Sequence, residues 1–166
     1  HPCRPTPAAE IHNSAGTPGT AGWDTNQTLT ERGLKTALRT VGRDDQQGPA
    51  IASYVAHELK AKKVAIADDK TAYGEGLANE VEKTLKADKV TVVASERTND
   101  KETDIKAILT KIKTKNPDVV FYGGMEATGG PLLKEERELG IMPVLAVGDG
   151  ACQTKLGHVA GADDQD

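Results

Sequence analysis

Three polar loops carry the side chains that are best suited to chemistry. Tyr73 lies in the segment TAYGEG, Met125 ends the segment YGGM, and Asp149 stands between two glycines in GDG. A tyrosine in such a loop either anchors the loop to its scaffold or closes over the apolar part of a ligand. Asp149 either forms a tight turn, which Asp and Gly favour, or presents a carboxylate to a cationic group. For Tyr73 and for Asp149, both interpretations stay open.

Two other motifs point to chemistry less strongly. Asp68 and Asp69 follow an apolar run, as in the magnesium site of response-regulator receivers. A receiver needs a further acid after a later strand, and the run that ends in Tyr122 has none, so helix capping or a turn is the simpler interpretation. The segment from Gly74 to Gly76 begins like a dinucleotide fingerprint, but Asn79 stands where the third glycine is required.

The chain offers no convincing catalytic or metal-binding set. Cys152 and His158 could suggest a thiol nucleophile, but the four histidines are scattered and no base with an orienting partner is identifiable. The spacing of His, Cys, Asp and Glu matches no metal site. We therefore expect no catalytic residue, no metal and no cofactor.

Composition indicates a folded protein that does not bind nucleic acid. The 166 residues are 37% hydrophobic and 28% charged, which is enough to form a core, and aromatic residues make up only 3%. The net charge of -4 argues against phosphate binding, which needs clustered Lys and Arg. No apolar run has the length of a membrane span, and no signal peptide is visible. A cytoplasmic protein and a mature or truncated exported protein both stay open.

Hydrophobic patterning predicts an α/β fold with a parallel sheet and helices on both faces. Strands are expected at residues 63–67, 90–95, 118–122 and 143–147, and helices at 48–60, 74–86, 103–115 and 131–139. Ligands of such sheets lie beyond the carboxyl ends of the strands. We therefore expect Tyr73, Met125 and Asp149 to line one concave face.

The ends of the chain are less regular. Residues 1–32 are rich in Pro, Gly, Thr and Asn, and we expect an irregular, loosely packed segment there, or one borrowed by a partner chain. A short strand is expected within residues 34–40, and a short helix near Lys155.

Several motifs in order resemble one family. These are Asp44-x-x-Gln-Gly-Pro49, the segment KVAIADDKTAYGEGLA from Lys63, then YGGM from Tyr122 and GDG from Gly148. Together they resemble the leucine/isoleucine/valine-binding proteins of bacterial ABC uptake systems, over about residues 33–161. A weaker similarity runs back to His1. The resemblance implies a type I periplasmic binding fold with an amino acid held between two lobes.

The resemblance assigns roles and boundaries. Residues 1–40 would be a remnant of the first lobe with the hinge crossing, and residues 41–166 the second lobe. Thr25 matches the threonine that holds the ligand's head group, Tyr73 the tyrosine that closes over the ligand, and Asp149 the acid that pairs with the α-ammonium. Met125 stands where some members have a second cleft aromatic. The implied protein is a periplasmic non-enzyme that delivers branched-chain amino acids to a membrane permease.

The sequence also departs from the family pattern. Most of the first lobe is absent, and Arg4-Pro5-Thr6-Pro7 replaces the serine-rich loop that grips the ligand carboxylate. Trp23 and Gln27 replace a small residue and a proline beside Thr25. Cys3 lacks its usual first-lobe partner, and we expect no disulfide between Cys3 and Cys152. A fragment that no longer binds amino acids and serves as an interaction or structural module is the alternative, and a homo-oligomer through uncovered lobe surface is also left open.

Overall fold

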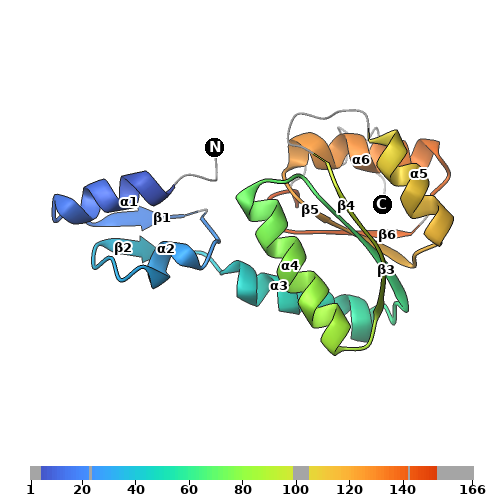
Figure 1. Cartoon of the computed structure of the whole chain (residues 1–166), viewed down its shortest axis with the longest axis horizontal. Coiled ribbons are helices and arrows are strands. Elements are labelled where there is room, and N and C mark those ends of the chain that lie inside the picture. Colours follow the sequence, from blue (N-terminus) through green and yellow to red (C-terminus); the bar gives the residue numbers. More distant parts are fainter. Residues whose placement is uncertain (1–4, 23, 99–104, 142, 153–166) are drawn as a thin grey trace.

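The computed structural model of the chain describes residues 5–22, 24–98, 105–141 and 143–152. The larger part is a four-stranded parallel sheet in the order β4-β3-β5-β6 (Figure 1). Its strands are β3 (Lys63–Asp68), β4 (Thr91–Arg97), β5 (Val119–Gly123) and β6 (Val144–Val147). Its helices are α3 (Asp44–Ser53), which runs into the π-helical turn η1 (Tyr54–Glu58), α4 (Ala72–Ala87), α5 (Lys106–Lys115) and α6 (Glu126–Glu138). The predicted α/β fold with a parallel sheet is confirmed.

Alternating residues of the central strands β3 and β5 pack into two separate hydrophobic cores, one on each face of the sheet. Val64 and Ile66 of β3 and Phe121 of β5 pack with α3, η1 and α4 on one face. Ala65 and Ala67 of β3, with Val120 and Tyr122 of β5, pack with α5 and α6 on the other. Because β3 and β5 are buried on both faces, they are continuous apolar runs in the sequence. Figure 1 shows the two helix pairs on opposite sides of the sheet.

Two helices begin earlier than the sequence pattern predicts. α3 begins at Asp44 rather than near Gly48; at its start the backbone N–H of Arg43 donates to Gln46 Oε1 at 3.2 Å, and Gln46 N–H donates to the carbonyl of Arg43 at 3.0 Å. α6 begins at Glu126 rather than at Pro131. The residues Thr128, Gly129 and Gly130 in its first turns are all buried, so close packing outweighs the low helix propensity of glycine.

The N-terminal part corrects the expectation of an irregular segment in residues 1–32. The described residues form α1 (Pro5–Ser14), β1 (Gly19–Ala21) and α2 (Thr28–Glu31), and β2 (Ala37–Arg39) lies within the predicted strand at 34–40. β1 and β2 pair in parallel, with Gly19 opposite Ala37 and Ala21 opposite Arg39. This order comes from pairing between distant segments, which local composition does not reveal.

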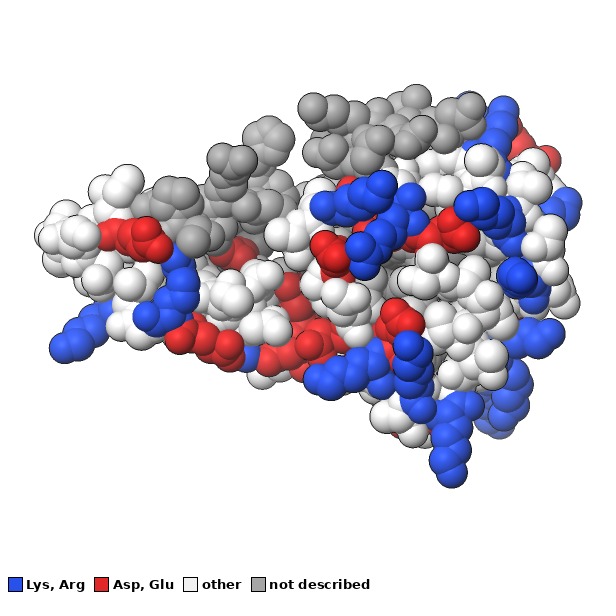
Figure 2. All heavy atoms as spheres, viewed as in Figure 1, with Lys and Arg blue, Asp and Glu red and all other residues white. Residues whose placement is uncertain are grey.

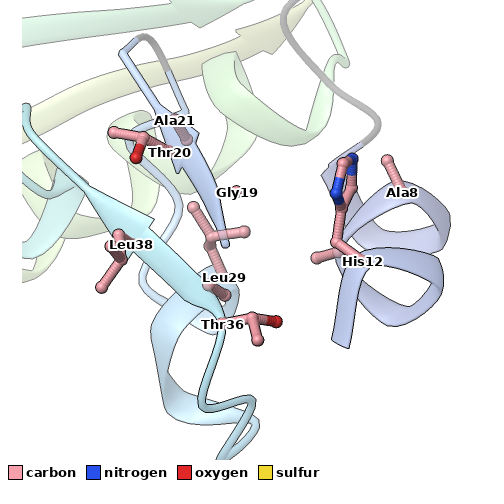
Figure 3. Close-up of a pocket in the computed structure, with 10 residues that line it drawn as sticks. Ala8, His12, Gly19, Thr20, Ala21, Leu29, Thr36 and Leu38 are labelled. Carbon is pink, nitrogen blue, oxygen red and sulfur yellow. The ribbon is translucent and has the colours of Figure 1, made fainter. Parts of the chain in front are cut away.

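The N-terminal part is thinly packed. His12 of α1 faces β1, and a cavity of about 170 Å³ lies between α1 and the two strands, lined also by Leu29 and Leu38 (Figure 3). Leu38 is 51% exposed. The helix expected near Lys155 lies outside the described residues.

Residues 40–43 connect β2 to α3. The backbone N–H of Asp44 donates to the carbonyl of Thr25 at 2.9 Å, which ties the start of α3 to the N-terminal part. Arg43 adds ion pairs with Glu31 of α2 and with Asp45. Acidic side chains gather along this junction on the face shown in Figure 2. The division into a lobe remnant of residues 1–40 and a lobe of residues 41–166 stays a prediction.

Candidate functional site

The loop after β3 is built by its two aspartates. Asp69 Oδ1 accepts from the backbone N–H of Thr71 at 3.0 Å and from its hydroxyl at 2.6 Å. The Thr71 hydroxyl oxygen in turn accepts from Gly74 N–H at 2.9 Å, which caps the start of α4. Asp68 and Asp69 are 2% and 1% exposed. These contacts agree with the turn interpretation of the aspartates rather than with a metal site, whereas the helix cap itself is Thr71.

Asp69 also reaches the next loop. Its second oxygen, Oδ2, accepts from the backbone N–H of Met125 at 3.2 Å. The carbonyl of Gly123 accepts from Asp69 N–H at 3.1 Å. Asp69 therefore fixes the loop that carries Tyr73 against the loop that carries Met125. Local sequence indicates only a turn or capping role for Asp69, because the long-range bond depends on the neighbouring positions of β3 and β5.

Tyr73 is joined directly to the loop after β6. Its hydroxyl donates to Asp149 Oδ1 at 2.6 Å and accepts from Gly150 N–H at 3.0 Å. Burial raises the pKa of Tyr73 well above its ordinary value, and the bond to Asp149 raises it further. The tyrosine thus stays a neutral phenol that can donate to the carboxylate. Asp149 itself is exposed.

The two glycines beside Asp149 are required by close approach. A Cβ at Gly148 would lie 2.6 Å from the Tyr73 hydroxyl oxygen and 2.4 Å from Leu77 Cδ2. A Cβ at Gly150 would lie 2.7 Å from Tyr73 Cε1 and 3.0 Å from Met125 Sδ. The same distances place both Tyr73 and Met125 against Gly150. The GDG segment is therefore pressed against Tyr73, which fixes the position of the carboxylate between the glycines.

Asp44 lies between Thr25 and the loop that carries Asp149 and links the two by its contacts and charge. Thr25 and Asp44 are both buried. Neither oxygen of the Asp44 carboxyl has a hydrogen-bond partner of normal geometry among the described residues. The nearby Thr25 hydroxyl has the smaller effect on the pKa of Asp44 and lowers it. Burial has the larger effect and raises the pKa of Asp44, and the charges of Asp149 and Asp24 raise it further. Asp44 therefore lies within electrostatic reach of both Thr25 and Asp149.

The structure thus places Tyr73, Met125 and Asp149 together, although their loops are far apart in sequence. Thr25 has no described contact with these three and is linked to them by Asp44. Asp44 was not singled out as a site residue; the signal was an acid at the start of the DxxQGP motif, directly after the expected hinge. Tyr73 is only 8% exposed, so in this arrangement it packs as a loop anchor.

The described residues give no support to a metal site or to a thiol nucleophile. Within residues 5–22, 24–98, 105–141 and 143–152, no group of three or more His, Cys, Asp and Glu could hold a metal ion. Cys152 is exposed and forms no disulfide with any of the described residues. Cys3, Arg4 and His158 lie outside the described residues. The expectation of no disulfide between Cys3 and Cys152 therefore stays a prediction. None of the helices in the described part is long and apolar enough to cross a membrane.

Comparison with known proteins decides the family. The family model for periplasmic binding proteins matches residues 7–164, which is nearly the whole chain. The chain belongs to the periplasmic binding protein family. A Leu/Ile/Val-binding protein of Rhizobium johnstonii is 41% identical over 128 residues, covering 77% of this chain and 35% of that protein. An amino acid binding protein of Pseudomonas aeruginosa is 39% identical over 155 residues, covering 93% of this chain and 41% of that protein.

Solved structures of the family have the same fold. A leucine-binding protein from Thermotoga maritima aligns with a TM-score of 0.86 at 26% identity, covering 92% of this chain and 43% of that one. A branched-chain amino acid binding protein from Streptococcus pneumoniae, solved with isoleucine, gives 0.84 at 28% identity, with coverage of 92% and 43%. The chain therefore spans about two fifths of the length of these relatives. Such relatives are solute-binding proteins rather than enzymes, and none of the similarities supports a homo-oligomer.

Proposed function

We propose that this chain is the solute-binding component of an ABC uptake system and binds leucine, isoleucine or valine between two lobes. The observation that carries the proposal is the Tyr73–Asp149 pair at the carboxyl edge of the sheet. The exposed carboxylate of Asp149 is held at 2.6 Å by the Tyr73 hydroxyl and is confined by a glycine on each side. A fixed carboxylate is suited to pair with an α-ammonium, which needs a charged partner once it leaves water.

The other proposed residues fit an aliphatic amino acid. The thioether of Met125 is soft and apolar. It lies beside Gly150, and Gly150 is the neighbour of Asp149 in the loop after β6. Thr25, from the N-terminal part, would hold the head group from the other side of the cleft. Tyr73 would hold Asp149 in place beside the ligand. No bond is made or broken in this function; closure of the lobes about residues 40–43 would enclose the ligand.

The partners and compartment follow from the same proposal. Relatives at 34–41% identity are named as amino-acid-binding proteins, most of them for leucine, isoleucine and valine. A protein of this kind would deliver its ligand to a membrane permease and would work in the periplasm. The alternative, an αβ module that no longer binds amino acids, is favoured by the thin packing of the N-terminal part and by its 170 Å³ cavity.

A ligand series separates the two proposals. Leucine, isoleucine, valine and glutamate are titrated into the ¹⁵N-labelled chain, and the amide signals of the loops after β3, β5 and β6 are followed. The transport proposal predicts saturable shifts with the three aliphatic amino acids and none with glutamate, whose second carboxylate would approach Asp149 and an apolar surface. Absence of saturable shifts with every aliphatic amino acid would favour the module.

A further inference from the structure

Arg39, the last residue of β2, reaches back to the loop that carries Thr25. Its Nη1 donates to the carbonyl oxygen of Asn26 at 2.8 Å, with a longer contact to the carbonyl of Asp24 at 3.4 Å. Its Nη2 donates to the hydroxyl oxygen of Thr30. One guanidinium therefore fixes three points on the loop between β1 and β2.

Asp44 holds the same loop from the other side. Its backbone N–H donates to the carbonyl of Thr25 at 2.9 Å. The three successive carbonyl groups of Asp24, Thr25 and Asn26 are thus all engaged, the outer two by Arg39 and the middle one by the start of α3. Thr25 is 5% exposed. Its backbone has little freedom to rotate while these donors are in place.

Short turns within the loop complete the arrangement. Asp24 Oδ1 accepts from Asn26 N–H at 3.1 Å, and Asn26 Oδ1 accepts from the N–H and hydroxyl of Thr28 at 3.0 and 2.7 Å. These bonds shape the backbone locally. They do not attach the loop to the rest of the protein, whereas the Arg39 guanidinium attaches it to the strand that leads into residues 40–43.

We infer that Arg39 is a positioning residue for ligand recognition, which holds Thr25 where it meets the ligand's head group. The inference rests on the proposed function, in which Thr25 binds that head group. A loop fixed in advance avoids the entropy cost of ordering on binding. Lysine cannot substitute for Arg39, because a single ammonium on a flexible stem does not reproduce the planar fork that spans several acceptors.

The first test measures leucine affinity by NMR titration in Arg39→Lys, Thr25→Val and the double variant. Each single change is expected to weaken binding roughly tenfold, because Thr25→Val removes a hydrogen bond to the head group and Arg39→Lys removes charge-assisted bonds that position it. If Arg39 acts through Thr25, the double variant binds no more weakly than Thr25→Val alone. Equal losses from Arg39→Lys in the presence and absence of the Thr25 hydroxyl would overturn the inference.

A matched control is Arg137→Lys. This exposed arginine stands in the last turn of α6, at the opposite end of that helix from Met125. Leucine affinity is expected to be unchanged. A loss equal to that of Arg39→Lys would show a general effect of replacing arginine and would count against the inference.

The second test needs no ligand, so it distinguishes failure of this inference from failure of the proposed function. In Arg39→Lys, the backbone amides of Asn26 and Leu29 should exchange with solvent at least about tenfold faster, while those of Leu77 and Val120 in the two cores keep their rates. Unchanged exchange in the loop would overturn the role of Arg39 whatever leucine does. Faster exchange in a chain that never binds leucine would refute the proposed function alone.

A milder variant covers the case in which Arg39→Lys also exposes the core amides. Thr30→Val removes only the hydroxyl that accepts from the guanidinium. It should accelerate exchange at Asn26 and Leu29 without affecting the cores. No change in the loop for Thr30→Val, together with general unfolding in Arg39→Lys, would show that Arg39 supports the fold rather than positioning Thr25.

Discussion

At the scale of residues, one phenol orders the loop that carries the proposed ligand acid. The Tyr73 hydroxyl is both a donor to Asp149 and an acceptor from Gly150 N–H, at 2.6 and 3.0 Å. Because burial raises its pKa, the phenol keeps its proton near neutral pH and can donate to the Asp149 carboxylate. Asp149 is thereby held without losing its exposure to a ligand.

Removal of this hydroxyl should have two effects. Tyr73→Phe leaves Gly150 N–H without its acceptor and frees Asp149, so we expect a loss of about 1–2 kcal/mol in the free energy of unfolding and weaker leucine binding. Urea unfolding and NMR titration measure the two. Tyr54→Phe is the control, since Tyr54 is 57% exposed and should tolerate the change. Equal stability of Tyr73→Phe and the unaltered chain would contradict the account.

At the scale of elements, the close contact between α3 and α4 depends on a glycine, Gly48, which has no side chain. A Cβ at Gly48 would lie 2.6 Å from Glu80 Cβ and 3.2 Å from the backbone of α4. The next turn presents Ala52, which is fully buried. The small residues allow α3 to lie directly on α4, and this sets where Asp44 and Tyr73, near the starts of the two helices, stand relative to each other.

Gly48→Ala should therefore force the two helices apart. We expect a destabilisation of about 1–3 kcal/mol in urea unfolding, the usual cost of overpacking, although alanine favours helix more than glycine does. Gly22→Ala is the matched control, because a Cβ there meets no atom within 4 Å. A Gly48→Ala variant more stable than the parent would show that α3 is free to move away from α4.

A buried carboxyl in α6 should make stability depend on pH. Glu136 is 2% exposed, its Oε1 has no hydrogen-bond partner in the described part of the chain, and burial raises its pKa to about 7. The folded state thus binds this proton more tightly than the unfolded state does. Stability from this group is present at acidic pH and is lost as the pH rises from the ordinary glutamate value of 4.5 through about 7.

Glu136→Gln should remove that dependence. The variant is expected to exceed the parent in unfolding free energy by a few kcal/mol at about pH 8 and to approach it near pH 5, in urea titrations at matched salt. Glu138→Gln, an exposed change on the same helix, should leave the profile unaltered. A constant difference between Glu136→Gln and the parent across this range would contradict the assigned cause.

The sequence was most informative where burial is continuous and least where order depends on distant partners. β3 and β5 are apolar on both faces, so runs such as KVAIA predicted them within a residue or two. β1 is only three residues long and depends on β2, so composition alone suggested a loop. Tyr73 and Asp149 could be proposed because both follow parallel strands, whereas the bonds of Asp69 to Met125 and of Asp44 to Thr25 could not be foreseen, since their partners come from separate elements.

At the scale of the whole molecule, the chain has the fold of part of a periplasmic binding protein. It covers about two fifths of the length of its relatives, and the N-terminal part contributes one short two-stranded sheet. A ligand at Asp149 would be enclosed on one side by the loops after β3, β5 and β6 and only partly on the other. We therefore expect this chain to bind leucine weakly, with a dissociation constant on the order of millimolar or above.

The most direct test of the account compares leucine with its deaminated analogue, 4-methylpentanoate, in the parent chain and in Asp149→Asn. Asparagine keeps an oxygen for the Tyr73 hydroxyl, so the change removes charge with little loss of shape. The account predicts that leucine shifts the amide signals of Gly150 and Thr25 in the parent, that this response is lost in Asp149→Asn, and that the analogue gives no such contrast. A leucine response that is the same in both proteins would contradict the assignment of Asp149 as the partner of the ammonium.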